Sequence, residues 1–189
     1  MKTIITIITV FILMSSIHAQ EPLAFEKIIR ADSIDKNVLF VAINEWFTIN
    51  YNSSKDVIQM ADKEQGVIIG KGNFKFIHTP SKFSLTGYGG VIHYTLKCYV
   101  KDNRYKVIVQ DFNHEDVSVN YYNGTPMEAM DFGLLTDVKL YREKGFKKDY
   151  VNEAWNQLKS QSYDYANYVF QSLEQKTNSI GLELANDEW

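Results

Sequence analysis

A glycine-rich stretch with a lysine, GVIIGKG at residues 66–72, is the first place in the sequence where a phosphate could bind. A phosphate-binding P-loop needs four residues between its first glycine and the Gly-Lys pair, followed by Ser or Thr for the metal ion. Here three residues intervene, and Gly72 stands where the hydroxyl is needed. The stretch also lies inside an apolar run typical of a strand. We therefore interpret its glycines as a bulge or as a place where a helix crosses closely.

Metal binding would need three converging ligands, and the candidates are His78, His93, His114, Asp111 and Glu115. No two of these histidines have the i, i+4 spacing of a helical metal site. His114 and Glu115 are adjacent at a strand end, so their side chains should face opposite sides. We expect solvated histidines at strand ends and no metal or other cofactor. A hydrolase acting through His114, Glu115 or Asp111 is the least favoured functional hypothesis.

Nucleophilic catalysis has equally little support. The sequence has no Gly-x-Ser-x-Gly elbow. Cys98, the single cysteine, falls on the apolar side of a strand pattern, where a thiol is inert. The carboxylate pairs, Asp62 with Glu64 and Glu115 with Asp116, fall in expected turns or exposed ends. The sequence therefore predicts a protein that is not an enzyme.

The clearest structural signal is the alternation from Ile92 to Val100, where even positions are apolar and odd positions, Tyr99 excepted, are mostly polar. A tight turn at residues 101–104 should return the chain antiparallel over residues 105–112. A slip of one residue would turn Cys98 and its neighbours outward, so we expect a fixed register.

Weaker patterns complete the predicted order of elements. Strands are expected at residues 23–30, 56–61 and 67–77, the last two joined by a turn at 62–66. A helix begins near Val38, with Asp32 or Ser33 as its N-cap and Asp35 in its first turn, and ends near Tyr51. A long helix over residues 149–177 carries one apolar stripe, and residues 113–148 form an excursion with little local structure. This order, β-α-β-β-β-β-α, predicts the α+β class: an antiparallel sheet of about five strands with two helices packed on one face.

The first 19 residues have the features of a secretory signal peptide. Lys2 precedes an apolar run from Ile4 to Met14, which is too short to span a bilayer, and Ala19 completes a cleavage pattern. We expect a periplasmic or secreted protein with a single domain over residues 20–178 and a flexible acidic tail over 179–189. Removing Lys2 leaves 19 basic and 23 acidic residues, a net charge of −4. This charge argues against a general nucleic-acid binder.

Several short motifs occur in an order that resembles a known family. They are the segments EWF at 45–47, SKDVIQ at 54–59, DKE at 62–64, GKG at 70–72, DNRY at 102–105 and DFNHE at 111–115. They resemble the bacterial domain of unknown function family 4468, which is described as having a TATA-binding-protein-like (TBP-like) fold. The resemblance implies a curved antiparallel sheet with helices on one face. It implies no known activity, so no catalytic residues are carried over.

The leading functional hypothesis is a non-enzymatic binding or interaction module in the bacterial envelope. Its contact surface would be the sheet face that the helices leave open, with the residues Lys71, Lys75, His93, Lys97 and Tyr99. The partner would be an envelope protein, a glycan or a lipid, and not a nucleic acid. The alternative is a periplasmic lipid or small-ligand carrier with a cavity between sheet and helices.

Two further groups of residues are interpreted as minor features. The basic cluster Lys139, Arg142, Lys144, Lys147 and Lys148 is interpreted as a solvated helix start, because Glu143 and Asp149 dilute its charge. Asp32-Ser33-Ile34 resembles a bacterial O-glycosylation site, and Asn52-Ser53-Ser54 and Asn123-Gly124-Thr125 fit the N-linked pattern.

Overall fold

The computed structural model describes residues 21–51, 54–79, 89–117, 121–122, 125–126, 131–138 and 147–186. The expected signal peptide, most of the basic cluster and parts of both N-linked patterns lie outside these residues. The elements in chain order are β1 (Ala24–Arg30), α2 (Lys36–Asn50), α3 (Ser54–Val57), β2 (Ile58–Asp62), β3 (Val67–Ile77), β4 (Gly89–Lys101), β5 (Arg104–Glu115), β6 (Tyr121–Tyr122), β7 (Thr125–Pro126), β8 (Gly133–Leu134) and α4 (Lys147–Asn186). None of the described helices is long and apolar enough to cross a membrane.

The main sheet is antiparallel with the strand order β1-β5-β4-β3-β2, and β8 pairs with the end of β5. The turn at residues 101–104 joins β4 to β5 as the sequence predicts, with Asn103 in the left-handed conformation at φ 62°. Beyond it, Cys98 pairs with Val107 and Leu96 with Val109. The first strand, β1, forms one edge of the sheet and pairs with β5, so that Arg30 lies opposite Arg104. The predicted α+β class and element order are confirmed.

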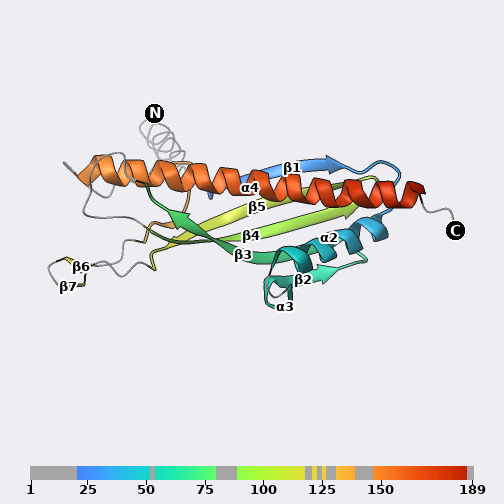
Figure 1. The fold of residues 1–189 in the computed structure, drawn as a ribbon, viewed down its shortest axis with the longest axis horizontal. Coiled ribbons are helices and arrows are strands. Elements are labelled where there is room, and N and C mark those ends of the chain that lie inside the picture. The colour runs from blue at the N-terminus through green and yellow to red at the C-terminus, as the bar shows by residue number, and fades with distance from the viewer. Residues whose placement is uncertain are drawn as a thin grey trace, which may run out of the picture.

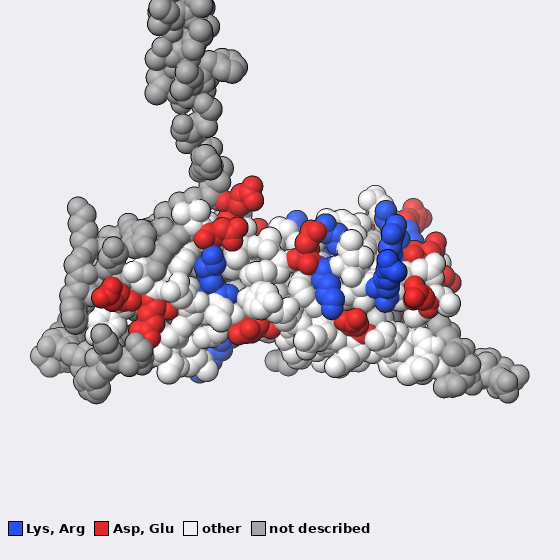
Figure 2. Space-filling model, turned by 90° about the horizontal axis from the view of Figure 1, so that it is seen from above, with Lys and Arg blue, Asp and Glu red and all other residues white. Residues whose placement is uncertain are grey.

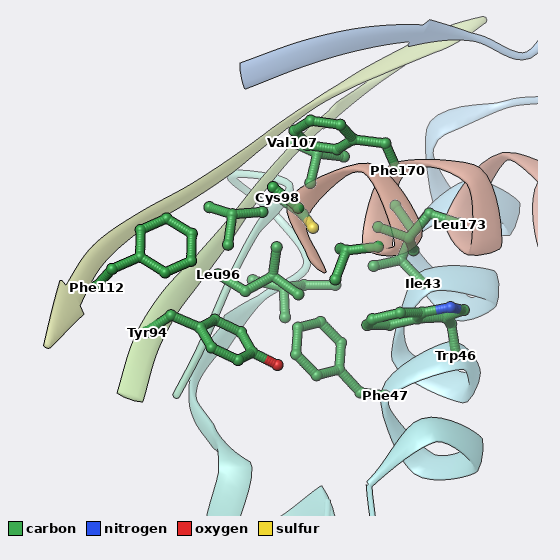
Figure 3. Packing of buried hydrophobic residues seen from close by; sticks show 14 of the residues in the cluster. Ile43, Trp46, Phe47, Tyr94, Leu96, Cys98, Val107, Phe112, Phe170 and Leu173 are labelled. Atoms are coloured by element: carbon green, nitrogen blue, oxygen red, sulfur yellow. The ribbon is translucent and has the colours of Figure 1, made fainter. Parts of the chain in front are cut away.

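Both long helices lie on one side of the sheet, and α4 runs along its length (Figure 1). Buried side chains of β4, among them Leu96 and Cys98, point toward Ile43 of α2 and Leu173 of α4 (Figure 3). Trp46 Nε1 donates a hydrogen bond of 2.8 Å to Ser172 Oγ, which links the two helices. The predicted apolar stripe on the last helix is confirmed, because Ala154, Leu158 and Val169, which belong to it, are fully buried.

The helix boundaries differ from the predicted ones at both ends of the chain. Asp35 is the N-cap of α2, not Asp32 or Ser33, because its carboxylate accepts hydrogen bonds from the backbone N–H groups of Asn37 and Val38. Helix α4 continues to Asn186, so the expectation of a loose tail was wrong for residues 179–186. These residues show no clear helical pattern, but a helix already formed adds residues at little cost.

Two strand boundaries were also predicted wrongly. Asp56 and Val57 belong to the short helix α3, and β2 begins only at Ile58. Strand β5 runs three residues past Phe112. A bulge at Asp111, with φ 59°, shifts the inward- and outward-facing positions by one residue, so that pairing with β4 continues beyond it. Asp is one of the residues that tolerate this left-handed conformation.

Candidate functional site

The five residues predicted for the binding surface do lie on one face of the sheet. In the β3–β4 register, Lys71 is opposite Thr95, Lys75 opposite Val91, and Ile69 opposite Lys97. Val67 pairs with Tyr99, and Asn73 with His93. Residues opposite one another in an antiparallel pair point to the same side. Since the intervening positions are buried under the helices, these pairs face away from α2 and α4. We call this side of the sheet the open face.

The open face is richer in basic than in acidic side chains. By strand register it carries Arg30, Lys71, Lys75, Lys97, Lys101, Arg104 and Lys106. The acidic residues on it are Glu26, Asp62 and Glu115. On the side of the molecule seen from above, acidic and basic side chains are interspersed (Figure 2). A chain that is acidic overall therefore has a predominantly basic open face.

His93 forms a hydrogen bond with Glu115 on the open face. Its Nε2 lies 3.1 Å from Glu115 Oε2, and both side chains are about half exposed. The pair places a proton donor and an acceptor side by side in contact with water. It can hydrogen-bond a ligand's hydroxyl groups, which suits a binding surface.

The residues considered for a metal site or a hydrolase do not converge. His114 is 1% exposed on the helix side of β5, whereas Glu115 points to the open face. Asp111 sits in the bulge, where its carboxylate accepts a hydrogen bond from Gln110 Nε2 at 2.9 Å. Within the described ranges no group of three ligand-type side chains is close enough to hold a metal ion.

The expectation that the histidines are solvated was wrong for His114. Phe76 and Phe132 pack against its ring at centroid distances of 5.3 and 5.4 Å. Phe132 N–H donates to Nδ1 at 3.3 Å, so Nε2 carries the proton and donates to the carbonyl of Gly89 at 3.2 Å. Burial lowers the pKa of His114, and the hydrogen bond to Gly89 and the charges of Asp116 and Asp131 oppose this only in part. The sequence gives no signal for the burial, because the bulge at Asp111 decides which face His114 takes.

The glycines of the GKG segment allow close approach, as expected. A Cβ on Gly70 would lie 2.6 Å from the ring of Phe47 on α2, and one on Gly72 would collide with the hydroxyl of Tyr94. That hydroxyl bonds to Tyr51 Oη at 2.6 Å and to Tyr165 Oη at 2.8 Å. The segment thus makes room for a helix and a tyrosine network, and Lys71 points to the other face.

Cys98 is fully buried, as its place in the alternation predicts. Burial raises the pKa of its thiol to about 12. A thiol held neutral in an apolar core is neither a nucleophile nor a metal ligand. Its role is to fill space between β4 and the helices.

The structure shows a pocket that sequence reasoning missed, at the β4–β5 hairpin end of the sheet. It has a volume of about 430 Å³ and is lined by Ile28, Tyr99, Lys101, Arg104, Tyr105 and Lys106. Only Tyr99 among these belongs to the predicted surface. The interior between sheet and helices, where a carrier would hold its ligand, is filled by side chains with 0–2% exposure, such as Leu96 and Phe47.

The comparisons with known proteins agree on the fold. The model of a family described as "domain of unknown function (DUF4468) with TBP-like fold" matches residues 25–115. A DUF4468 family protein from Bacteroides ovatus is similar at TM-score 0.57 and 15% identity, covering 85% of this chain and 91% of that chain. A TBP-like protein from Parabacteroides distasonis is similar at TM-score 0.53 and 14% identity, covering 83% and 93%. No curated protein matches the sequence.

Proposed function

Residues 25–115 match the DUF4468 family with its TBP-like fold, and on that premise we propose that the protein is a non-enzymatic binding module. Its proposed partner is an acidic glycan of the cell envelope. The observation that carries the proposal is the basic open face, where lysines of β3 and β4 share one side of the sheet with Tyr99.

The size of the open face favours an extended partner. The strands β1 to β5 have 7, 5, 11, 13 and 12 residues, and about 3.4 Å per residue with about 4.8 Å between strands gives a surface of about 780 Å². An area on the order of 800 Å² is what one partner contributes to a standard macromolecular interface. A chain of several sugars can cover such a surface.

The chemistry between the basic residues favours a glycan over a membrane. Thr95, Asn73 and Gln110 lie among the lysines and can hydrogen-bond sugar hydroxyls. Tyr99 is 39% exposed and offers a ring on which a sugar can stack. The lysine ammonium groups attract carboxylates over roughly 10 Å at 0.1 M salt.

The envelope location is part of the proposal. It is supported by the basic start, the apolar run and the Ala19 cleavage pattern of residues 1–19. Edman sequencing of protein purified from a periplasmic or culture-medium fraction tests it. We expect the chain to start at Gln20, and a chain that keeps Met1 in the cytoplasmic fraction would contradict it.

The binding test uses polygalacturonate as the acidic glycan and dextran as the neutral one. Changing Lys71→Gln and Lys97→Gln together should weaken polygalacturonate binding about three- to tenfold, since exposed ion pairs contribute about 0.2–1 kcal/mol each. The matched control changes Lys159→Gln and Lys176→Gln on α4, which removes the same charge from the helix side. Binding of the control should be that of the unaltered protein.

Three results would overturn the proposal. They are no binding of polygalacturonate at low salt, equal weakening by both double variants, and a clear preference for single-stranded DNA over the glycan. Dextran should not bind at any salt concentration used, and added salt should weaken the complex with polygalacturonate.

A further inference from the structure

Three basic residues lie side by side across three neighbouring strands at the hairpin end of the open face. The register places Arg30 of β1 opposite Arg104 of β5, and Arg104 opposite Lys101 of β4. We call these three residues the cation row. Directly opposed side chains are about 5 Å apart at Cβ, so three like charges at this spacing destabilise the sheet.

No acidic residue relieves this repulsion in the part of the chain that the structure describes. None of the ion pairs there includes a member of the cation row. Asp102, the acidic residue of the turn, is used elsewhere, because its Oδ1 accepts the backbone N–H of Lys36 at 2.8 Å. An arrangement that costs stability and has no internal counter-charge is complementary to an external anion.

The next row toward the middle of the sheet has a different chemistry. Ile28, Lys106 and Tyr99 lie opposite one another in the register, and all three line the pocket with Lys101 and Arg104. Ile28 is 61% exposed and Tyr99 is 39% exposed, and together they form what we call the apolar floor. Lys106 is neutralised by Glu26, with Nζ and Oε2 2.6 Å apart.

From this juxtaposition we propose that the pocket binds a small phosphorylated ring compound such as a sugar phosphate. The ring lies in the pocket on the apolar floor, and the phosphate lies at the pocket's edge against Lys101 and Arg104, with Arg30 next to Arg104. A phosphate monoester carries up to two negative charges, and arginine's planar donors bind phosphate oxygens in pairs. The volume of about 430 Å³ lies in the range of small-molecule sites.

The Glu26–Lys106 pair at the side of the pocket gives the site an orientation. Glu26 repels a second anionic group and can accept a hydrogen bond from a ring hydroxyl. The proposal deepens the proposed function, since it rests on the open face being a binding surface and names a chemical group that this surface recognises.

The experiment measures binding of glucose 6-phosphate, inorganic phosphate and glucose to the folded domain by calorimetry, with backbone amide NMR shifts as the second readout. Glucose 6-phosphate should bind more tightly than inorganic phosphate, glucose should not bind, and the shifts should centre on residues 99–106. Arg104→Gln should weaken glucose 6-phosphate binding about tenfold, as expected for a lost charge-assisted pair of hydrogen bonds. Lys159→Gln on α4 is the matched control, with the same charge change on the helix side of the sheet, and should leave binding unchanged.

A second variant separates the phosphate from the ring. Tyr99→Val keeps a strand-forming side chain but removes the stacking surface, so it should reduce the affinity for glucose 6-phosphate to that for inorganic phosphate. The affinity for inorganic phosphate itself should not change. Because the cation row is repulsive, Arg104→Gln should not lower the melting temperature, which excludes misfolding as the cause of its weaker binding.

The outcomes distinguish this inference from the proposed function. If polygalacturonate binding depends on Lys71 and Lys97 but glucose 6-phosphate does not bind, the inference is wrong and the proposed function stands. Equal affinity for glucose 6-phosphate and inorganic phosphate in the unaltered protein would show an adventitious anion only. Equal weakening by Arg104→Gln and Lys159→Gln would show general electrostatic attraction to the protein and would also overturn the inference.

Discussion

Acidification should destabilise the fold through His114. The ring is 1% exposed and neutral, and its pKa is lowered by burial. Above the usual histidine pKa of about 6.5 both the folded and unfolded states are neutral, so this residue adds no pH dependence there. Below a pH of about 6.5, His114 binds a proton in the unfolded chain but not in the folded state. The free energy of unfolding then falls as pH falls, until the lowered pKa of the folded state is reached.

The size of the effect follows from the linkage between protonation and folding. One group that is protonated only in the unfolded state changes the free energy of unfolding by about 1.4 kcal/mol per pH unit. The structural reason is local: a protonated Nδ1 can no longer accept the N–H of Phe132, now 3.3 Å away. A small domain has only about 5–15 kcal/mol of stability, so this loss is measurable over one pH unit.

The assay is urea unfolding of the unaltered protein and of His114→Gln from pH 8 to pH 5. At pH 8 the variant should be less stable, because a buried hydrogen-bonded side chain is lost. As pH falls below about 6.5 the difference should shrink, since only the unaltered protein loses the stability linked to His114. Ile68→Val, a buried truncation that costs about 0.5–1.5 kcal/mol and has no titratable group, should differ from the unaltered protein by a constant amount. A constant difference for His114→Gln as well would refute the reasoning.

Three further predictions concern the packing of the core. Gly70→Ala should destabilise the fold by about 1–3 kcal/mol, because its Cβ would lie 2.6 Å from the Phe47 ring. Gly181→Ala should stabilise it by about 0.5–1 kcal/mol, because Gly181 is in a helix and its Cβ would meet only Ile34 Cδ1 at an ordinary 3.4 Å. Urea unfolding measures both free energies. Burial raises the pKa of the Cys98 thiol to about 12, so Cys98 should not react with a thiol reagent at pH 8 until guanidinium unfolds the chain. Reaction of the folded protein would contradict its burial. Tyr94→Phe should lower the free energy of unfolding by about 1–3 kcal/mol, because the Tyr51 and Tyr165 hydroxyls lose their hydrogen-bond partner at 2.6 and 2.8 Å. Unchanged stability in thermal unfolding would show that water replaces the lost hydroxyl.

The sequence predicts those parts of the fold that local patterns control. The alternation from Ile92 to Val100 places Cys98 in the core, and the three- and four-residue spacing in the last helix identifies the stripe that includes Leu158. Turn residues such as Asn103 fix the hairpin. These signals lie within one or two elements, so they can be recognised without the tertiary structure.

The errors occur where the decisive contact is distant or the local choice is nearly balanced. Asp35 caps α2 although Asp32 and Ser33 are equally good capping residues, and only the geometry of the chain after β1 selects among them. The burial of His114 depends on a bulge at Asp111 that shifts the alternation of β5. The sequence shows no glycine at the bulge, so its pattern could not indicate this shift.

Part of the candidate site could likewise be predicted from the alternation within one strand, and part of it depends on which strands pair. Lys97 and Tyr99 could be predicted for the open face because they share one strand with a clear alternation. The cation row could not, since Arg30 is separated from Lys101 and Arg104 by the whole of α2 and three strands. It exists because β5, the last of the five main strands along the chain, lies next to β1 in the sheet and pairs with it. A net acidic chain can therefore present a basic surface that neither its composition nor any short motif reveals, and the pairing of its first strand assembles the densest part of that surface.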